Sequence, residues 1–382
     1  MALDVIHCEK SKHFRDFLNV PFLLHKNNKN WVPPLKVITK HILHKKNPFH
    51  QNADMSLWIA YRHNKPVGRI ACIINKTHNH FYNENVAFWG FFESENNHEI
   101  TTALFNTIEE WSLNQKISKI RGPMNPSINY ECGLQISAFD TKPYFMMPQN
   151  PEYYISLIEN QGYNKIQDLQ AWNINVQQAK IEPRKIQTLK TLQKKYDIHI
   201  RLANKKHFAK ELELISKIYN DAWQDNWGYL PLDFKEFDYL ISDLKSILDP
   251  NLIYIAEIAG EPCGFSVGVP DINQLLLNNR NGKLLSLKLL KLIWQIKVSK
   301  SINQFRIPLL GVLKKYKHLP IGAILYYEYF KRITPESQFF GAECSWILES
   351  NHAMQAGLRL VNATHYKSYR IYEKNFLKMD NN

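Results

Sequence analysis

Two clusters of polar and aromatic side chains have the composition of a substrate-binding site. The first is Asn220-Asp-Ala-Trp-Gln-Asp-Asn-Trp-Gly-Tyr-Leu-Pro, with Trp223, Asn226 and Trp227 as candidate binding residues. It follows an amphipathic helix predicted over Glu211–Tyr219, and the spacing of the two tryptophans predicts that they share one helix face. Buried Trp and Asn need hydrogen-bond partners, so the cluster forms either a substrate site or a capped aromatic core.

The second cluster is the segment Asn125-Pro-Ser-Ile-Asn-Tyr-Glu, in which Asn125, Asn129, Tyr130 and Glu131 supply polar groups. Its Asn, Pro and Ser residues are typical of turns. Loops with such chemistry often carry function, so these side chains are candidates for substrate binding.

A third candidate could hold phosphate groups. The segment Lys314-Lys-Tyr-Lys-His-Leu-Pro-Ile-Gly-Ala joins a strand predicted over Arg306–Val312 to a helix predicted over Gly322–Arg332. A helix N-terminus attracts anions, and glycine allows a ligand to approach the backbone closely. Lys314, Lys315 and Lys317 could add positive charge, although a plain basic turn before a buried helix explains the same residues.

Other residues argue against a metal site and against disulfide bonds. The pairs His78/His80 and His41/His44 have no nearby acidic or Cys partners that would complete a metal site. The five cysteines are widely spaced and form no CxxC motif, which favours reduced thiols. No secretory signal or apolar run of membrane-spanning length occurs, and we expect a cytoplasmic protein.

Length and charge narrow the class of protein further. A chain of 382 residues with 45% hydrophobic residues is expected to form two domains with their own cores. Its formal net charge of +13 would attract polyanions such as nucleic acid, anionic lipid or a phosphate-rich cofactor. Alternatively, the charge serves only to keep the protein soluble.

The order of predicted elements indicates a duplicated domain. A hairpin over residues 57–74 has Ile59, Ala60, Pro66 and Gly68 where a second hairpin has Ile255, Ala256, Pro262 and Gly264. Strands and helices follow each hairpin in a similar order. We therefore predict an N-terminal domain over 1–175, a basic connector over 176–197 and a C-terminal domain over 198–382.

This order resembles the GNAT (Gcn5-related N-acyltransferase) fold occurring twice. A closer resemblance, to a bacterial tandem-GNAT family that includes bacterial ceramide synthase, lies in three segments: Gly122-Pro-Met-Asn-Pro-Ser-Ile-Asn-Tyr-Glu-Cys-Gly, Tyr144-Phe-Met-Met-Pro-Gln-Asn-Pro and Trp223-Gln-Asp-Asn-Trp-Gly. The resemblance implies an α/β fold of two GNAT-like domains. Each has a mixed, mostly antiparallel sheet flanked by helices.

The resemblance also implies an acyl-CoA site in the second half. GNAT proteins place a Q/R-x-x-G-x-G/A loop after the fourth strand, which Lys317-x-x-Pro320-x-Gly322 matches in part. Pro320 replaces a glycine and removes an N–H donor, which weakens the match. The candidate cofactor-binding residues are Leu310, Val312, Lys314, Lys315, Lys317, Gly322, Ala323 and Asn351. The first half has acidic residues at the equivalent place, beginning at Glu93, and is expected to be a degenerate copy.

GNAT enzymes often carry a carboxylate where Glu343 begins a predicted strand, so Glu343 is the candidate general base. The family's usual acid is a Tyr seven residues after an Asn, but Leu358 occupies that position counted from Asn351. Tyr366 could replace it, although strand tyrosines are more often part of the core. A backbone N–H within Leu309–Val312 could stabilise the charge of the tetrahedral intermediate.

The resulting hypothesis is an acyl-CoA-dependent N-acyltransferase, similar to N-acetyltransferases, that needs no metal and acylates an amine bound between the halves. The apolar and basic segment 283–300 suggests peripheral membrane contact and a hydrophobic or lipid-like amine. Two alternatives stay open: a Fem-like aminoacyl transferase that uses charged tRNA, and a non-catalytic ligand-binding protein. Apart from such a tRNA donor, nucleic acid is not an expected partner.

Overall fold

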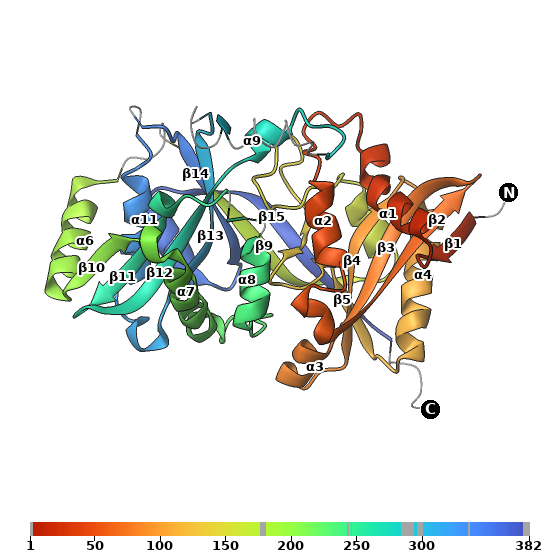
Figure 1. The fold of residues 1–382 in the computed structure, drawn as a ribbon, viewed down its shortest axis with the longest axis horizontal. Coiled ribbons are helices and arrows are strands. Elements are labelled where there is room, and N and C mark those ends of the chain that lie inside the picture. Colours follow the sequence, from red (N-terminus) through yellow and green to blue (C-terminus); the bar gives the residue numbers. More distant parts are fainter. Residues whose placement is uncertain are drawn as a thin grey trace. The chain divides into compact units, whose positions relative to one another are not determined.

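A computed structural model describes residues 3–175, 181–242, 244–245, 247–283, 294–295, 301–334 and 337–376 (Figure 1). The chain forms two units. Unit 1 comprises Met1–Asp168, Leu276–Leu284 and Ser368–Asn382, and unit 2 comprises Leu169–Leu275 and Leu285–Lys367. Each unit therefore contains residues from both halves of the sequence.

The sheet of unit 1 is mixed, because β4 and β5 pair in parallel and the neighbouring strands pair antiparallel. In spatial order its strands are β1 (Leu3–His7), β2 (Ala53–Arg62), β3 (Lys65–Asn75), β4 (Val86–Ser94), β5 (Lys119–Gly122) and β15 (Thr364–Asn375). Short strands follow β5, namely β6 (Met124–Asn125), β7 (Glu131–Cys132) and β8 (Leu134–Gln135). The helices are α1 (Ser11–Leu24), α2 (Lys36–Leu43), α3 (Lys76–Tyr82), α4 (His98–Asn114) and α5 (Tyr154–Glu159), with a 3-10 turn at Pro48–Gln51.

Unit 2 repeats this plan, with β13 and β14 as its parallel pair. Its strands in spatial order are β9 (Asn164–Asn175), β14 (Gly341–Leu348), β13 (Gln304–Val312), β12 (Glu261–Pro270), β11 (Ile253–Ile258) and β10 (Ile198–Leu202). Its helices are α6 (Pro183–Lys195), α7 (Phe208–Trp223), α8 (Phe234–Ser242), α9 (Asn273–Leu276), α11 (Ile321–Phe330) and α12 (His352–Leu360). Three 3-10 turns lie at Lys205–His207, Pro250–Leu252 and Lys314–Tyr316. The predicted α/β fold with mixed pairing and flanking helices is confirmed, although the strands named for the two units belong to one 13-stranded sheet.

The last strand of each half completes the sheet of the other unit. Strand β9 ends the first half, yet it pairs with β14 in unit 2 from Leu169 opposite Leu348 to Asn175 opposite Gly341. Strand β15 ends the second half and pairs with β5 in unit 1, where Tyr372 lies opposite Gly122. The sequence reasoning predicted β15 as a strand but did not identify β9 or the exchange.

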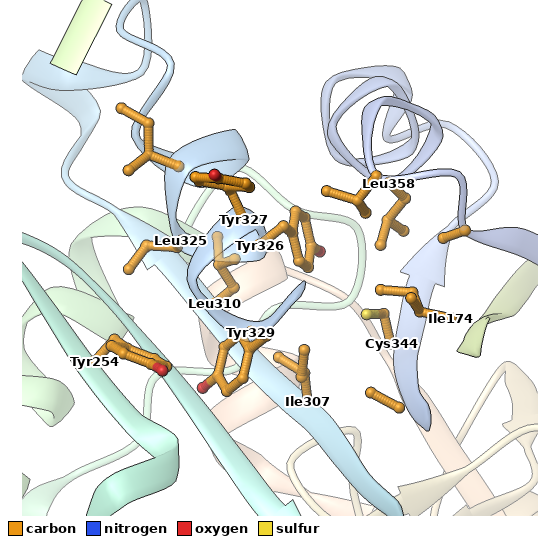
Figure 2. Close-up of a cluster of buried hydrophobic side chains, with 14 of the residues drawn as sticks. Ile174, Tyr254, Ile307, Leu310, Leu325, Tyr326, Tyr327, Tyr329, Cys344 and Leu358 are labelled. Atoms are coloured by element: carbon orange, nitrogen blue, oxygen red, sulfur yellow. The ribbon is translucent and has the colours of Figure 1, made fainter. Parts of the chain in front are cut away.

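The core of unit 2 lies between the sheet and the helices α11 and α12 (Figure 2). Helix α11 is apolar on all sides and buries Ile324, Leu325, Tyr326 and Tyr329, as expected of a helix within a core. Leu189 of α6 joins the same core, so the described part of the predicted connector is a helix packed on unit 2. Residues 176–180 and most of the apolar segment 283–300 lie outside the described residues.

Helix α1 continues through Pro21. Proline has no N–H, so it leaves the carbonyl oxygen of Phe17 without its usual helical partner. The buried side chain of Arg69 donates a hydrogen bond from Nη1 to that oxygen at 2.9 Å. This replacement bond explains how the helix tolerates a buried proline.

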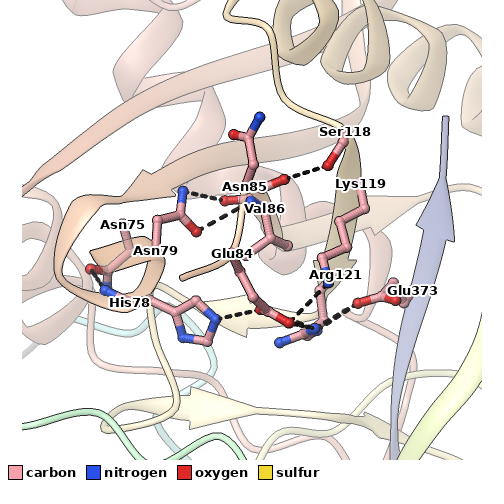
Figure 3. A network of polar contacts seen from close by, with 10 residues as sticks. All are labelled: Asn75, His78, Asn79, Glu84, Asn85, Val86, Ser118, Lys119, Arg121 and Glu373. Carbon is pink, nitrogen blue, oxygen red and sulfur yellow. Dashed lines mark hydrogen bonds and ion pairs between the residues drawn. The ribbon is translucent and has the colours of Figure 1, made fainter. Parts of the chain in front are cut away.

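An ion-pair network in unit 1 holds Lys119 and Arg121 of β5 in place (Figure 3). The carboxylate of Glu84 accepts hydrogen bonds from Lys119 at 2.9 Å, Arg121 at 3.3 Å and His78 at 3.1 Å. Burial raises the pKa of Glu84, but the bonds from Lys119 and His78 and the charge of Arg121 outweigh it and lower that pKa to about 2. Burial lowers the pKa of His78 to about 4, so His78 is neutral near pH 7.

Two further observations concern disulfide bonds and membrane-spanning helices. The five cysteines are free thiols. Among the described residues, no helix is both long and apolar enough to cross a bilayer.

Replacing Glu84 with Gln should lower the free energy of unfolding at pH 7 by about 1 to 2 kcal/mol, a value reduced for the partial exposure of Glu84. Because the folded-state pKa of Glu84 is depressed, its stabilisation is complete above the unfolded pKa of 4.5 and is lost towards pH 2. Urea titrations followed by tryptophan fluorescence should therefore show the variant and the wild type converging as the pH falls from 4.5.

The control is Glu213→Gln, which removes an exposed pair with Lys217 and should leave the free energy of unfolding nearly unchanged. A constant difference between Glu84→Gln and the wild type across this pH range would contradict the assignment.

Candidate active site

A buried ion pair links the two parallel strands of unit 2. Arg306 on β13 lies directly opposite Glu343 on β14, and their side chains are almost fully buried. Their strand neighbours Ile307 and Cys344 belong to the core beneath α11 and α12. Because side chains alternate along a strand, Arg306 and Glu343 face the other side of the sheet.

Four side chains form one network on this face. Ser345 and Tyr366 each donate a hydroxyl hydrogen bond to the Glu343 carboxylate, the former at 2.7 Å. Arg306 donates to Ser345 from Nε at 2.8 Å and from Nη2 to the Ser345 carbonyl oxygen at 3.0 Å. Arg306 Nε also lies 3.8 Å from the Glu343 carboxylate. The network holds a buried anion at a fixed position.

Tyr366 differs from the other tyrosines of β15. Tyr369 and Tyr372 are fully buried and serve the core, as expected of strand tyrosines, whereas Tyr366 is half-buried. Its hydroxyl is bonded to buried Glu343, so it connects the carboxylate to a less buried region. The structure thus brings together the predicted catalytic pair Glu343 and Tyr366.

Three residues next to this pair were not predicted from the sequence: Arg306, Ser345 and Asn173. Asn173 on β9 lies directly opposite Glu343, so the two side chains share a face. Its Oδ1 is buried and has no hydrogen-bond partner among the described residues. A charged residue in each of two apolar strand runs was the signal that could have identified the Arg306–Glu343 pair.

Strands β13 and β14 separate beside this network. Their pairing ends at Ile307 and Cys344, and Pro308 follows at once. From Leu309 to Val312 strand β13 pairs with β12. Trp223 Nε1 donates a 3.1 Å hydrogen bond to the Leu310 carbonyl oxygen, which joins a predicted substrate residue to a predicted cofactor residue.

The N-terminus of α11 retains its N–H donors despite Pro320. Pro320 is the N-cap, and the first intrahelical bond runs from Ile324 N–H to the Pro320 carbonyl oxygen at 3.0 Å. The three preceding N–H groups, of Ile321, Gly322 and Ala323, therefore belong to the first turn, where anions bind. A Cβ added at Gly322 would meet only Leu310, at 3.6 Å, so packing does not require glycine there.

The neighbouring lysines are already paired with a carboxylate. Lys314 Nζ lies 2.8 Å and Lys317 Nζ 3.3 Å from Asp225, just beyond α7, while Lys315 lies over the Tyr316 ring. The hydrogen bond from Lys314 lowers the pKa of Asp225. A phosphate at this loop would therefore compete with Asp225 for both ammonium groups.

Asn351 and Asn226, two other predicted residues of unit 2, have local structural contacts. Asn351 caps α12 by accepting a hydrogen bond from Met354 N–H at 3.1 Å. The prediction that Trp223 and Trp227 share a helix face is wrong, because α7 ends at Trp223. Asn226 lies in the turns that follow, where its N–H donates to the Trp223 carbonyl oxygen at 2.8 Å.

In unit 1 the corresponding separation of β4 from β5 is closed by the chain itself. A Cβ at Gly90 would lie 1.8 Å from the Met124 carbonyl oxygen, so only glycine fits there. Asn125 Oδ1 accepts a hydrogen bond from Phe91 N–H at 2.6 Å. Glu93 is not a surface acid, because it bonds to His25 Nε2 at 2.6 Å inside unit 1.

The remaining loop residues of unit 1 also have partners. The Tyr130 hydroxyl bonds to the Asn47 side chain at 3.2 Å, and Asn129 N–H donates to Ser127 Oγ at 3.3 Å. Glu131 on β7 pairs with Asn125 on β6. Their predicted role in substrate binding stays a prediction.

Comparisons with known proteins agree with this architecture. No protein-family model matches the chain. It is 36% identical to Protein YghO of Escherichia coli K12 over 94% of this chain and 92% of that protein. It is 33% identical to the bacterial ceramide synthase of Caulobacter vibrioides over 97% of each chain. The chain belongs to their family.

Solved structures show that this chain has the tandem GNAT fold. A tandem GNAT protein from the clavulanic acid biosynthesis pathway aligns with a TM-score of 0.56 over 99% of this chain and 100% of that chain, at 10% identity. A probable N-acyltransferase of Enterococcus faecalis V583 aligns with a TM-score of 0.50 over 98% of this chain and 73% of that chain, at 9% identity. The predicted resemblance to GNAT proteins and to bacterial ceramide synthase is confirmed.

Replacing Gly322 with Ala should stabilise the protein without ligand by about 0.5 to 1 kcal/mol, because alanine favours the helix and its Cβ has room. Differential scanning calorimetry should show a higher melting temperature for unit 2. Gly357→Ala in α12 is the matched control, since its Cβ would lie 3.3 Å from the Tyr326 ring and should give no such gain. Equal effects of the two substitutions would show that Gly322 is also restricted by packing.

Proposed function

We propose that this protein is an acyl-CoA-dependent N-acyltransferase whose acceptor is a hydrophobic or lipid-like amine. The observation that carries the proposal is the hydrogen bond from half-buried Tyr366 to buried Glu343, beside the separation of β13 from β14. End-to-end similarity to a protein named bacterial ceramide synthase supports both the reaction class and the acceptor class.

Unit 2 is the proposed site of the acyl donor. The first-turn N–H groups of α11 and the ammonium groups of Lys314 and Lys317 suit the diphosphate of acyl-CoA. Gly322 allows close backbone approach, and no packing contact explains its presence. Unit 1 has no equivalent opening at β4, since Met124 and Asn125 close it.

The proposed reaction needs one proton acceptor. The amine nitrogen attacks the thioester carbonyl carbon, the C–S bond breaks, and the products are an amide and a free thiol. As the amine gives up its proton to the Tyr366 oxygen, Tyr366 passes its own proton to Glu343. The leaving thiolate then takes a proton from Tyr366, which recovers one from Glu343, so the thiol is released and the carboxylate is restored. Asn173 Oδ1, which lacks a partner among the described residues, could accept an N–H of the incoming amine.

Substitutions of Glu343 and Tyr366 test the chemistry. Glu343→Gln and Tyr366→Phe should each lower kcat by about 100-fold or more, because each interrupts proton transfer while acyl-CoA still binds. Thiol release from palmitoyl-CoA with a sphingoid base, and the mass of the amide product, are the measurements. Glu213→Gln, on the surface of α7, is the control and should retain full turnover.

Near-normal turnover by Glu343→Gln would remove Glu343 from the mechanism. Turnover with charged tRNA, and no turnover with any acyl-CoA, would show that the donor is aminoacyl-tRNA and not acyl-CoA.

A charge reversal tests the donor site. Lys317→Glu should weaken acyl-CoA binding about tenfold or more, measured as the loss of the thermal shift caused by the ligand. Asp225→Asn should strengthen binding, because it releases Lys314 and Lys317 from their present partner. Lys331→Glu makes the same charge change at the other end of α11 and is the matched control. Equal weakening by the two lysine variants would place the diphosphate elsewhere.

A further inference from the structure

One face of unit 1 combines positive charge with exposed apolar side chains. From Phe17 to Ala53 the sequence has no Asp or Glu, yet it contains six Lys and four His. This segment includes the end of α1, the loop after it and all of α2. Its charge is therefore not balanced by acids of its own.

Helix α2 is unusual because none of its residues, all of which the structure describes, is fully buried. An amphipathic helix in a folded domain normally buries its apolar stripe. Here Val37 is 59% exposed, and Lys40 and His41 follow one turn later on the same side of the helix. An apolar side chain thus lies in solvent among basic ones.

A second chain segment adds charge at the start of α2. Arg280 Nη1 donates hydrogen bonds to the carbonyl oxygens of Asn28 and Trp31, both at 3.0 Å. Lys36 N–H donates to the Gly282 carbonyl oxygen at 3.1 Å. These bonds fix exposed Lys283 beside Lys36, so the charge cluster is part of the fold.

The charges of this cluster act on one another. Burial lowers the pKa of Lys36, and the neighbouring charges of Lys283 and Lys40 lower it further. The Lys36 ammonium group donates to the neutral amide oxygen of Asn19 at 2.6 Å. The region therefore has a positive potential that an external anion would reduce.

We propose that this basic face, defined as Lys36, Val37, Lys40, Lys45, Lys46 and Lys283, docks unit 1 on an anionic lipid bilayer. The lysines would contact acidic headgroups, and Val37 would enter the boundary with the acyl chains. Exposed Val37, between Lys36 and Lys40 on α2, favours a bilayer over nucleic acid, because binding to a nucleic-acid backbone requires only charge. The proposal does not depend on catalysis, although a membrane site would bring the protein to a lipid-like acceptor.

Vesicle sedimentation tests the proposal with the full chain and without any turnover. The wild type should bind vesicles of equal parts phosphatidylglycerol and phosphatidylcholine, and it should not bind pure phosphatidylcholine vesicles. The combined variant Lys40→Gln, Lys45→Gln and Lys46→Gln should lose about 100-fold in affinity. Val37→Ser should lose several-fold with no change in charge.

Two matched controls separate docking from general charge attraction. Lys205→Gln, Lys206→Gln and Lys210→Gln remove the same charge from an exposed surface of unit 2 and should retain most of the affinity. Leu113→Ser replaces an exposed apolar residue of α4, outside the basic face, and should have no effect. Circular dichroism of each variant confirms folding.

Equal losses in the two triple variants would overturn the proposal. Unchanged vesicle binding by Val37→Ser would also overturn it, because attraction would then be electrostatic only. Binding of the wild type to duplex DNA with higher affinity than to vesicles would assign the face to nucleic acid instead.

Discussion

The buried pairing of Arg306 with Glu343 is the constraint on which the candidate active site depends. Removing two charges from water costs several kcal/mol for each ion, and attraction repays this only when hydrogen bonds satisfy both groups. Ser345 and Tyr366 supply those bonds to Glu343, and Ser345 also receives two from Arg306. Because the two charged residues face each other across parallel strands, the network also fixes the register of β13 and β14 at the point where the strands separate.

The two units show how one duplicated plan can have different outcomes. In unit 2 the strands part beside the buried Glu343, and the N–H groups of the first turn of α11 precede the first intrahelical bond. In unit 1 the segment Met124–Asn125 crosses the equivalent place, and Asn125 accepts the Phe91 N–H. Glu93, expected from the sequence to repel phosphate, is instead a buried partner of His25, Arg69 and Tyr154. The asymmetry therefore results from packing more than from surface charge.

Much of the fold was predictable because hydrophobic periodicity marks strands and helices locally. Both hairpins and α11 agree with the sequence reasoning within a few residues. Contacts between distant segments were not predictable: Arg69 bonded to Phe17, Asp225 paired with Lys317, and Asn173 placed opposite Glu343. Glu343 and Tyr366 were identified as chemical types from a family resemblance, but Arg306 and Ser345 were missed because their roles arise only from strand register.

The exchange of terminal strands has a consequence for biosynthesis. Unit 1 needs β15, which lies near the carboxyl end of the chain, to complete its sheet beside β5. A ribosome has therefore synthesised all of unit 2 before the first unit can acquire its last strand. Domains usually mature in order as they emerge, but here the amino-terminal unit must wait with an open sheet edge. That edge presents the unpaired N–H and C=O groups of β5 until β15 has been synthesised.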